Sequence, residues 1–204
     1  MADTRILLVR HGETLYNRED RMRGTLDIAL TERGLAQARQ TAERLAGCRA
    51  AAIFSSPLQR AWRTALAIAR YQAVSPNKDP AFNDIDFGRW QGLTREEIRR
   101  RYGQEYAVYE NHPEEFFSSK GDNLWRLQRT AFSRLRQLAE QHIGHTMIIV
   151  SHYVTIRVLL LACLGLTPRA YWKFIQGTCA INEVRFNGND FIIQRVNDTH
   201  HIDG

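Results

Sequence analysis

The stretch Ile6-Leu7-Leu8-Val9-Arg10-His11-Gly12-Glu13 sets the architecture of this chain. Its first half is a short, uninterrupted apolar run, which is typical of a strand buried on both faces of a parallel sheet. Its second half is polar and begins with an arginine and a histidine. The same order, a buried strand followed at once by polar side chains, recurs at residues 51–60 and 146–152. Three such strands favour a sheet whose polar residues gather at one edge.

Helical patterns separate these strands. Thr31 begins one pattern, which Gly47 ends. Ser56-Pro57 predicts the start of the next helix, with Ser56 as the N-cap and Pro57 at the first helical position. The rest of the chain continues the alternation, with helices predicted over 58–70, 124–142 and about 154–164, and closing strands over 181–186 and 191–196, joined by the turn signal Asn187-Gly188-Asn189-Asp190.

This alternation predicts an α/β fold with a largely parallel sheet. The chain has 204 residues, enough for one substantial core, so we expect a single domain over 1–204. Residues 76–123 are richer in Pro, Gly, Asn and Asp, with one or two short helices expected among them. An irregular stretch of this length is more typical of a lid or cap than of a spacer.

Charge and hydropathy exclude several classes of protein. The net charge is +6, but the one run of arginines, Arg99-Arg100-Arg101, lies at helical spacing from Glu96 and Glu97. That spacing is typical of a solvated helix face, so we expect no nucleic-acid partner. The longest apolar run, near 158–164, is too short to span a membrane. The N-terminus lacks a signal-peptide pattern, which favours a cytoplasmic protein.

Cysteine usage points to the same compartment. Cys48, Cys163 and Cys179 are scattered and odd in number, and none has the spacing of a CxxC or Cys/His metal site. We therefore expect reduced thiols. Because no Asp/His/Cys cluster has the spacing of metal ligands, we also expect neither a metal nor a cofactor.

The predicted sheet edge brings together two arginines and two histidines: Arg10, His11, Arg60 and His152. Guanidinium groups suit the oxygens of a phosphate, which they bind bidentately. A neutral imidazole can attack phosphorus, and a second imidazole, if protonated, adds charge for the transferring group. Gly12 lets the backbone approach the phosphate. On spacing alone, catalysis and plain anion binding are equally favoured.

Five segments form an ordered set: LVRHGET at 8–14, GTLDIALTERGLAQA at 24–38, SSPLQRAWRTA at 55–65, IDFGRWQGL at 85–93 and VSHYVTIR at 150–157. Together they resemble the motifs of the histidine phosphatase superfamily, the phosphoglycerate mutase-like enzymes. The resemblance implies a three-layer α/β/α sandwich with a mostly parallel central sheet and a lid. It also implies metal-independent transfer of a phosphoryl group onto histidine and then to water.

The resemblance implies roles for individual residues. His11 matches the nucleophile that becomes phosphohistidine, and Arg10 and Arg60 match the residues that bind the phosphoryl oxygens. His152 matches the second histidine, which stabilises the transferring group. Further substrate contacts are expected from Asn17, Thr25 and Tyr153.

The sequence departs from the family's motifs at three places. The family's general acid is commonly a glutamate, and here the matching position is Asp84, whose side chain is one methylene shorter. The residue after the second histidine is usually glycine, and here it is Tyr153. A frequent Gly-Glu-Ser before the long helix is here Gly121-Asp122-Asn123. These changes keep the charged residues of the site and bear on the choice of substrate.

Hydrolysis of a small phosphomonoester is the leading function that the resemblance implies, with phosphoserine-like, α-ribazole phosphate-like or broad specificity. Phosphoglycerate mutase is the alternative, although the chain lacks the insertion and extended tail of the glycolytic mutases. A non-catalytic phospho-ligand binder is a minor alternative, which the loss of His11 or His152 would have favoured. The family also implies a homodimer.

Other histidines and the aromatic residues near the lid have structural interpretations. His112, His142 and His145 are expected at the surface. His200 and His201 stay open, because the chain end can fold over the pocket. Aromatic residues in or near the lid are expected mainly to pack against the core: Trp90, Tyr102, Tyr106, Tyr109, Phe116, Phe117 and Trp125.

Overall fold

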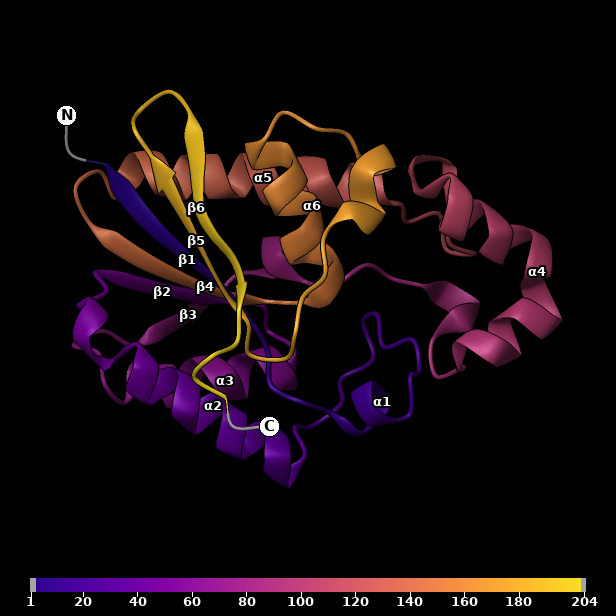
Figure 1. Ribbon diagram of the computed structural model, residues 1–204, viewed down its shortest axis with the longest axis horizontal. Helices are drawn as coiled ribbons and strands as arrows, with labels where there is room; N and C mark the ends of the chain where they lie inside the picture. Colours follow the sequence, from indigo (N-terminus) through magenta and orange to yellow (C-terminus); the bar gives the residue numbers. More distant parts are fainter. Residues whose placement is uncertain (1–2, 203–204) are drawn as a thin grey trace.

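The computed structural model describes residues 3–202, which form layers of helices on both sides of one six-stranded sheet (Figure 1). The strand order is β3-β2-β4-β1-β5-β6. The strands are β1 (Thr4–Arg10), β2 (Ala52–Ser55), β3 (Pro76–Lys78), β4 (Thr146–Ser151), β5 (Ile181–Phe186) and β6 (Phe191–Asp198). The first four are parallel, and the β5–β6 hairpin adds an antiparallel edge beside β1. The predicted α/β fold with a mostly parallel sheet is therefore confirmed.

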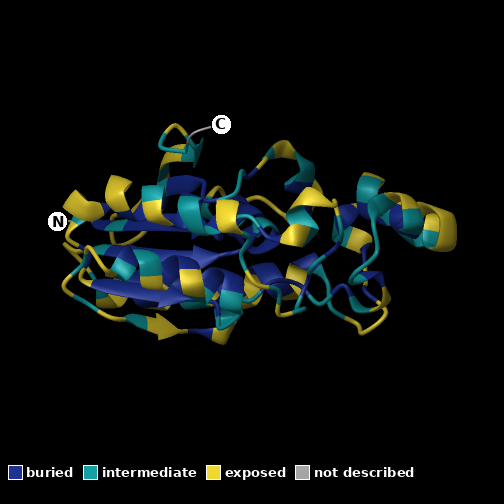
Figure 2. Ribbon diagram, turned by 90° about the horizontal axis from the view of Figure 1, so that it is seen from below, coloured by how far each residue is buried: buried dark blue, intermediate teal, exposed yellow. Residues whose placement is uncertain are grey.

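Helices cover both faces of the sheet because its strands alternate between two cores. In β1, Ile6 and Leu8 pack on the side of α5 and α6, while Leu7 and Val9 pack on the side of α2 and α3. None of the four is more than 1% exposed, so the strand is buried on both faces. Figure 2 shows the sheet as a buried layer between partly exposed helices. The four helices are α2 (Glu32–Arg44), α3 (Gln59–Ala69), α5 (Leu124–Gln141) and α6 (Tyr153–Cys163).

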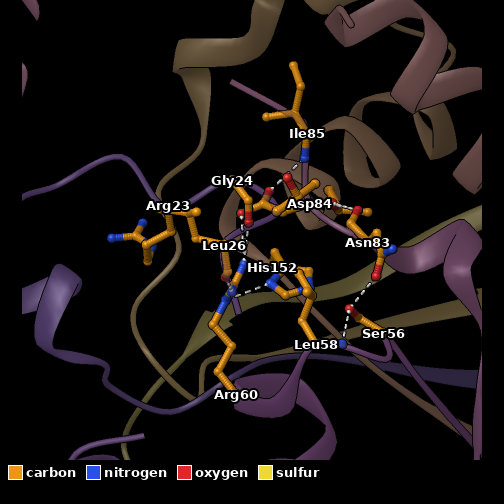
Figure 3. Close-up of polar contacts among 12 residues, drawn as sticks. Arg23, Gly24, Leu26, Ser56, Leu58, Arg60, Asn83, Asp84, Ile85 and His152 are labelled. Carbon is orange, nitrogen blue, oxygen red and sulfur yellow. Dashed lines mark hydrogen bonds and ion pairs between the residues drawn. The ribbon is translucent and has the colours of Figure 1, made fainter. Parts of the chain in front are cut away.

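The helix after β2 begins later than predicted. Its first residue is Gln59 and its N-cap is Leu58, so Ser56 is not the N-cap and Pro57 is not in the helix. The Ser56 hydroxyl instead donates to Asn83 Oδ1 at 2.7 Å and accepts from the Leu58 N–H. This turn therefore ties the start of α3 to the lid segment (Figure 3).

The lid predicted over 76–123 begins later and contains more helix than expected. Its first residues, Pro76–Lys78, form β3 and pair in parallel with β2, so they belong to the sheet. Helix α4 (Arg95–Asn111) has 17 residues and is interrupted by non-helical backbone at Tyr102. Figure 1 shows α4 projecting beyond the end of the sheet. The shorter elements are α1 (Leu15–Arg18), η1 (Ala46–Cys48), η2 (Pro80–Phe82), η3 (Gly88–Trp90), η4 (Pro113–Glu115) and η5 (Pro168–Lys173).

Aromatic side chains give the lid a core of its own. Four of the predicted aromatic residues are buried there and contact one another: Trp90, Tyr106, Tyr109 and Phe116. The packing prediction is wrong for Phe117 and Trp125, which are 62% and 45% exposed. The lid is thus a packed substructure rather than a loose loop.

Three further expectations concern the surface histidines, the cysteines and membrane-spanning helices. His112 and His145 are exposed as predicted, whereas His142 is half-buried with its ring edge-on to Phe54. The three cysteines are unpaired. No helix within residues 3–202 combines the length and the apolar composition that crossing a membrane requires.

Candidate functional site

The carboxyl ends of β1, β2 and β4 bring the predicted site residues together. Arg10 is the last residue of β1 and is in register with Ser151, the last residue of β4. His11 follows, and its backbone N–H donates to the Ser151 carbonyl at 3.0 Å. His152 is the N-cap of α6, and Arg60 is the second residue of α3. The ring centroids of His11 and His152 lie 5.3 Å apart, so the predicted histidine pair is formed.

Hydrogen bonding assigns the two ring nitrogens of His11. Its Nδ1 lies 2.7 Å from the carbonyl oxygen of Gly12. Because a carbonyl only accepts, Nδ1 carries the proton and Nε2 carries the lone pair. Nε2 is buried and has no hydrogen-bond partner among the described residues. Burial, and after it the charge of Arg60, lowers the pKa of His11 well below its usual value, so the ring is neutral near pH 7.

His152 has the opposite tautomer. The Nε–H of Arg60 donates to His152 Nδ1 at 3.2 Å, so the ring proton sits on Nε2. Nε2 is buried and unpartnered within residues 3–202. Burial and the Arg60 charge also lower the pKa of His152 well below its usual value. This ring therefore offers one neutral N–H donor, rather than the positive charge of a protonated imidazole.

Arg60 and Asp84 form a buried pair beside the histidines (Figure 3). The Nη1 and Nη2 groups of Arg60 donate to the carbonyl oxygens of Leu26 and Gly24 at 2.6 and 2.7 Å. Nη2 also lies 3.6 Å from the Asp84 carboxylate. Burial lowers the pKa of Arg60 to about 10, so it stays cationic at neutral pH. Burial raises the pKa of Asp84 and outweighs the opposing charge of Arg60.

A cavity of about 340 Å³ is lined by Arg10 and Tyr153, the sequence neighbours of His11 and His152. The guanidinium of Arg10 lies 5.0 Å from the ring centroid of Tyr153, so the tyrosine forms a wall of this cavity. Arg10 Nη1 donates to the Gln176 carbonyl at 2.5 Å, while its Nε is buried without a partner in the described chain. Burial lowers the pKa of Arg10 to about 9. The full lining is Arg10, Glu13, Asn17, Asp20, Arg23, Arg95, Tyr153 and Thr178.

The other two predicted contacts, Asn17 and Thr25, differ in position. Asn17 lines the cavity, but its side-chain oxygen accepts hydrogen bonds from the N–H and hydroxyl of Thr14. Its amide nitrogen is the end that remains for a ligand. Thr25 donates through its N–H and its hydroxyl to Gln91 Oε1, at 2.6 and 3.0 Å. Thr25 therefore fastens its loop to the lid, and it is not among the residues that line the cavity.

Up to residue 202, the end of the chain does not reach the cavity beside Arg10. The His200 ring is exposed and pairs with Asp198 at 3.1 Å. The His201 ring contacts the Thr41 hydroxyl on α2, also at 3.1 Å. Neither residue lines the cavity beside Arg10.

Within residues 3–202, one group of side chains has the spacing of metal ligands, where the sequence pattern predicted none. The ligand atoms of His112, Glu114 and Glu115 lie within 4.8 Å of one another at the exposed η4 turn. Exposed acidic groups of this kind are common without an ion. None of the three is a residue of the histidine pair or of the cavity described above.

Sequence reasoning missed Arg23. This residue lines the cavity, and its positive charge helps to lower the pKa of Arg10 and of His152. Its Nε is buried and without a partner in the part of the chain that the structure describes. The signal available in the sequence was its place directly before the motif at 24–38.

Known proteins resemble this chain along nearly its whole length. It is 29% identical over 198 residues to phosphoserine phosphatase 1 of Hydrogenobacter thermophilus, covering 97% of this chain and 94% of that protein. It is 28% identical over 203 residues to a protein of Yersinia pestis named as a probable phosphoglycerate mutase, with the same coverage. A solved phosphoserine phosphatase of Entamoeba histolytica, in complex with 3-phosphoglyceric acid, matches with a TM-score of 0.87 and 31% identity. The match covers 98% of this chain and 100% of the solved chain.

A sequence model of the histidine phosphatase superfamily, branch 1, matches residues 6–199. That range holds all five motifs and every residue of the buried cluster around His11 and His152. The sequence resemblance is thus confirmed, and the chain belongs to the histidine phosphatase superfamily (branch 1).

Proposed function

We propose that this protein is a phosphomonoesterase that hydrolyses a small phosphorylated metabolite through a phosphohistidine at His11. The observation that carries the proposal is the buried, neutral Nε2 of His11, which has no hydrogen-bond partner within residues 3–202. The ring centroids of His11 and His152 lie 5.3 Å apart. A phosphoryl group placed there meets one lone pair and the N–H donors of Arg10, Arg60 and His152. The relatives named as phosphoserine phosphatases support a small phosphate ester as the substrate.

The first chemical step forms a bond between His11 Nε2 and phosphorus and breaks the ester P–O bond. Arg10 and Arg60 stabilise the equatorial oxygens, and His152 donates its Nε2–H to one of them. The leaving oxygen takes the proton of Asp84, whose raised pKa suits a general acid. The products are the free alcohol, the Asp84 carboxylate and phosphohistidine.

The second step returns the enzyme to its starting state. Water attacks phosphorus and breaks the N–P bond, so the electron pair returns to His11 Nε2. The Asp84 carboxylate accepts the proton of the water, and inorganic phosphate leaves. Guanidinium groups and N–H donors provide the charge stabilisation, so the scheme needs no metal ion.

A phosphoglycerate mutase is the second candidate, because one relative of 28% identity carries that name. A mutase returns the phosphoryl group to a second substrate rather than to water. Incubation with 3-phosphoglycerate separates the two, since a phosphatase releases inorganic phosphate and a mutase forms 2-phosphoglycerate first. Much faster formation of 2-phosphoglycerate than of phosphate would favour the mutase.

The proposed hydrolysis is tested with protein that has been stripped of metals and assayed in EDTA. Phosphoserine and 3-phosphoglycerate should release inorganic phosphate, and the His11→Ala variant should release almost none. Loss of activity in the chelator, with recovery on adding a divalent ion, would refute the metal-free scheme. Light scattering of the same protein tests the homodimer that the family implies, and a cytoplasmic location likewise stays a prediction.

A further inference from the structure

Arg23 is an unpaired cation in the wall of the cavity. Within residues 3–202, no carboxylate lies within ion-pairing distance of it. The two carboxylates of the cavity already have partners: Asp20 pairs with Arg95 at 3.0 Å, and Glu13 pairs with Arg18 at 2.8 Å. The nearby charges of Asp84 and Asp20 act on Arg23 without pairing with it, and the lining, with three arginines and two carboxylates, keeps a net positive charge.

The Nε and Nη2 groups of Arg23 form the side of its guanidinium that makes no hydrogen bond to a described residue. Both hydrogen bonds of the Arg23 side chain leave from Nη1, to the carbonyl oxygens of Tyr16 and Arg21 at 3.3 Å. Nε is buried and unpartnered, and no hydrogen bond to a described residue uses Nη2. Nε and Nη2 form the edge that binds a carboxylate bidentately. Arg5 uses that edge on Glu183 in this same protein, at 2.8 and 3.1 Å.

The position of Arg23 separates it from the phosphoryl-binding groups. In Figure 3 its guanidinium points away from the Arg60–His152 pair. Arg10 adjoins both places, because it ends β1 directly before His11 and also lines the cavity with Arg23. A small ester with its phosphorus at His11 would therefore extend past Arg10 toward Arg23.

We propose that Arg23 is a specificity-determining residue that binds a carboxylate of the substrate. The preferred substrates are then small phosphomonoesters that bear a carboxylate a few bonds from the phosphate. This inference rests on the proposed phosphomonoesterase function. An ester without the carboxylate leaves the Arg23 edge buried and unpaired, and a site built for such a bond discriminates strongly against that analogue.

Two pairs of substrates test the inference, because the members of each pair differ in the carboxylate. They are 3-phosphoglycerate with glycerol 3-phosphate, and phosphoserine with phosphoethanolamine. The parent protein should favour the first member of each pair in kcat/KM. Arg23→Gln should lower kcat/KM for that member by about 10- to 100-fold and for the other by less than about threefold. Arg23→Lys, which keeps the charge but loses the bidentate edge, should lie between.

The matched control is Arg99→Gln, which removes one positive charge from an exposed position of α4. It should change neither member of a pair by more than about twofold, because an exposed charge is screened by solvent. Equal losses on both members in Arg23→Gln would place Arg23 among the phosphoryl-binding groups and overturn the inference. The proposed hydrolase function would survive that result.

Binding without turnover separates the two proposals. Calorimetry on the His11→Ala variant should find tighter binding of 3-phosphoglycerate than of glycerol 3-phosphate. The difference should disappear in His11→Ala/Arg23→Gln. Equal affinities for the two ligands in His11→Ala would contradict the role of Arg23, whatever the parent protein hydrolyses.

Discussion

In the proposed mechanism, Asp84 is the residue that makes the rate depend on the leaving group. Burial holds the pKa of its carboxyl above the usual value, although Arg60 lies 3.6 Å away. An alkoxide leaving group needs that proton, whereas p-nitrophenol leaves as a stable anion. Asp84→Asn should therefore lower kcat/KM, which reports transfer to His11, by about 100-fold or more for alkyl phosphates such as phosphoserine, and much less for p-nitrophenyl phosphate. Steady-state assays on both substrates measure the difference.

Asp86→Asn is the control for this prediction. The Asp86 carboxylate accepts the Gly88 N–H at 2.8 Å and lies 3.5 Å from Lys120 Nζ, so it stabilises the lid. Its loss should affect both substrates to the same extent. If Asp84→Asn also affected both equally, Asp84 would bind or orient the substrate and the proton would come from elsewhere.

The same carboxyl predicts a pH dependence. Only the protonated form of Asp84 donates, so kcat/KM for an alkyl phosphate should fall as pH rises through the raised pKa of Asp84. The fall should be absent in Asp84→Asn. It should be weak for p-nitrophenyl phosphate in the parent protein. If kcat/KM of Asp84→Asn fell with rising pH in the same way, the pH dependence would belong to another group.

Residues that directly follow a buried strand were predictable from the strand pattern, and Asp84 in the lid from the family resemblance, whereas an irregular loop residue outside the motifs was not. His11 and His152 follow strands β1 and β4, so strand order alone brings them to one edge. Arg23 lies in an irregular loop, and its role depends on the cavity that it shares with residues distant in sequence. Thr25 was predicted as a substrate contact because it lies in a motif, but the lid residue Gln91 holds it.

At the scale of elements, Gly12 joins the loop after β1 to helix α2. A Cβ at Gly12 would lie 2.4 Å from the Gly34 carbonyl oxygen, and one at Gly34 would lie 2.1 Å from the Glu13 carbonyl oxygen. The absence of a side chain at Gly12 thus lets the backbone of α2 approach closely. The sequence had suggested that it lets a phosphate approach. Gly12→Ala should lower the free energy of unfolding by about 1–3 kcal/mol and displace His11, with loss of kcat.

Urea unfolding and steady-state assays test this packing. Gly103→Ala is the control, because a Cβ at Gly103 in α4 would meet no atom within 4 Å. That change should leave stability unchanged or raise it by up to about 1 kcal/mol. Equal stability of Gly12→Ala and the parent protein would show that the two backbones can separate without cost.

Helix α4 and strand β3 show why some elements escaped prediction. Helix α4 is mostly polar and is broken at Tyr102, so its apolar residues follow no continuous helical stripe. Its start was still readable, since Thr94 and Glu97 form a capping box. Strand β3, Pro76-Asn77-Lys78, is short and polar and forms an edge of the sheet. Edge strands lack the apolar runs that identified β1, β2 and β4.

At the scale of the whole molecule, the histidine pair couples folding to pH. The pKa values of His11 and His152 are lowered on folding, below the unfolded value of about 6.5. Below that pH the unfolded chain binds protons that the folded chain does not. The contribution of these two histidines to the free energy of unfolding is therefore fully present above about pH 6.5 and is lost as pH falls. Asp84 acts in the opposite direction, because its contribution to the free energy of unfolding is lost as pH rises from about 3.9 toward its raised pKa.

Because two histidines oppose one carboxyl, the free energy of unfolding should decrease from about pH 7.5 to about pH 5.5. The double variant His11→Asn/His152→Asn lacks both groups and should show a flatter dependence. Urea unfolding at several pH values measures both proteins. A parallel decrease in the double variant would assign the pH dependence to other residues.

The phosphohistidine at His11 is the central claim, and trapping it is the most direct test. The substrate of choice is p-nitrophenyl phosphate with a labelled phosphorus, because its leaving group needs no acid. Asp84→Asn keeps the nucleophile but lacks the base for the attacking water, so the intermediate should accumulate. After an alkaline quench, we predict acid-labile label on the peptide that contains His11, and none in His11→Ala/Asp84→Asn. Turnover of this substrate by His11→Ala at the parent rate, or label on another residue, would contradict the account.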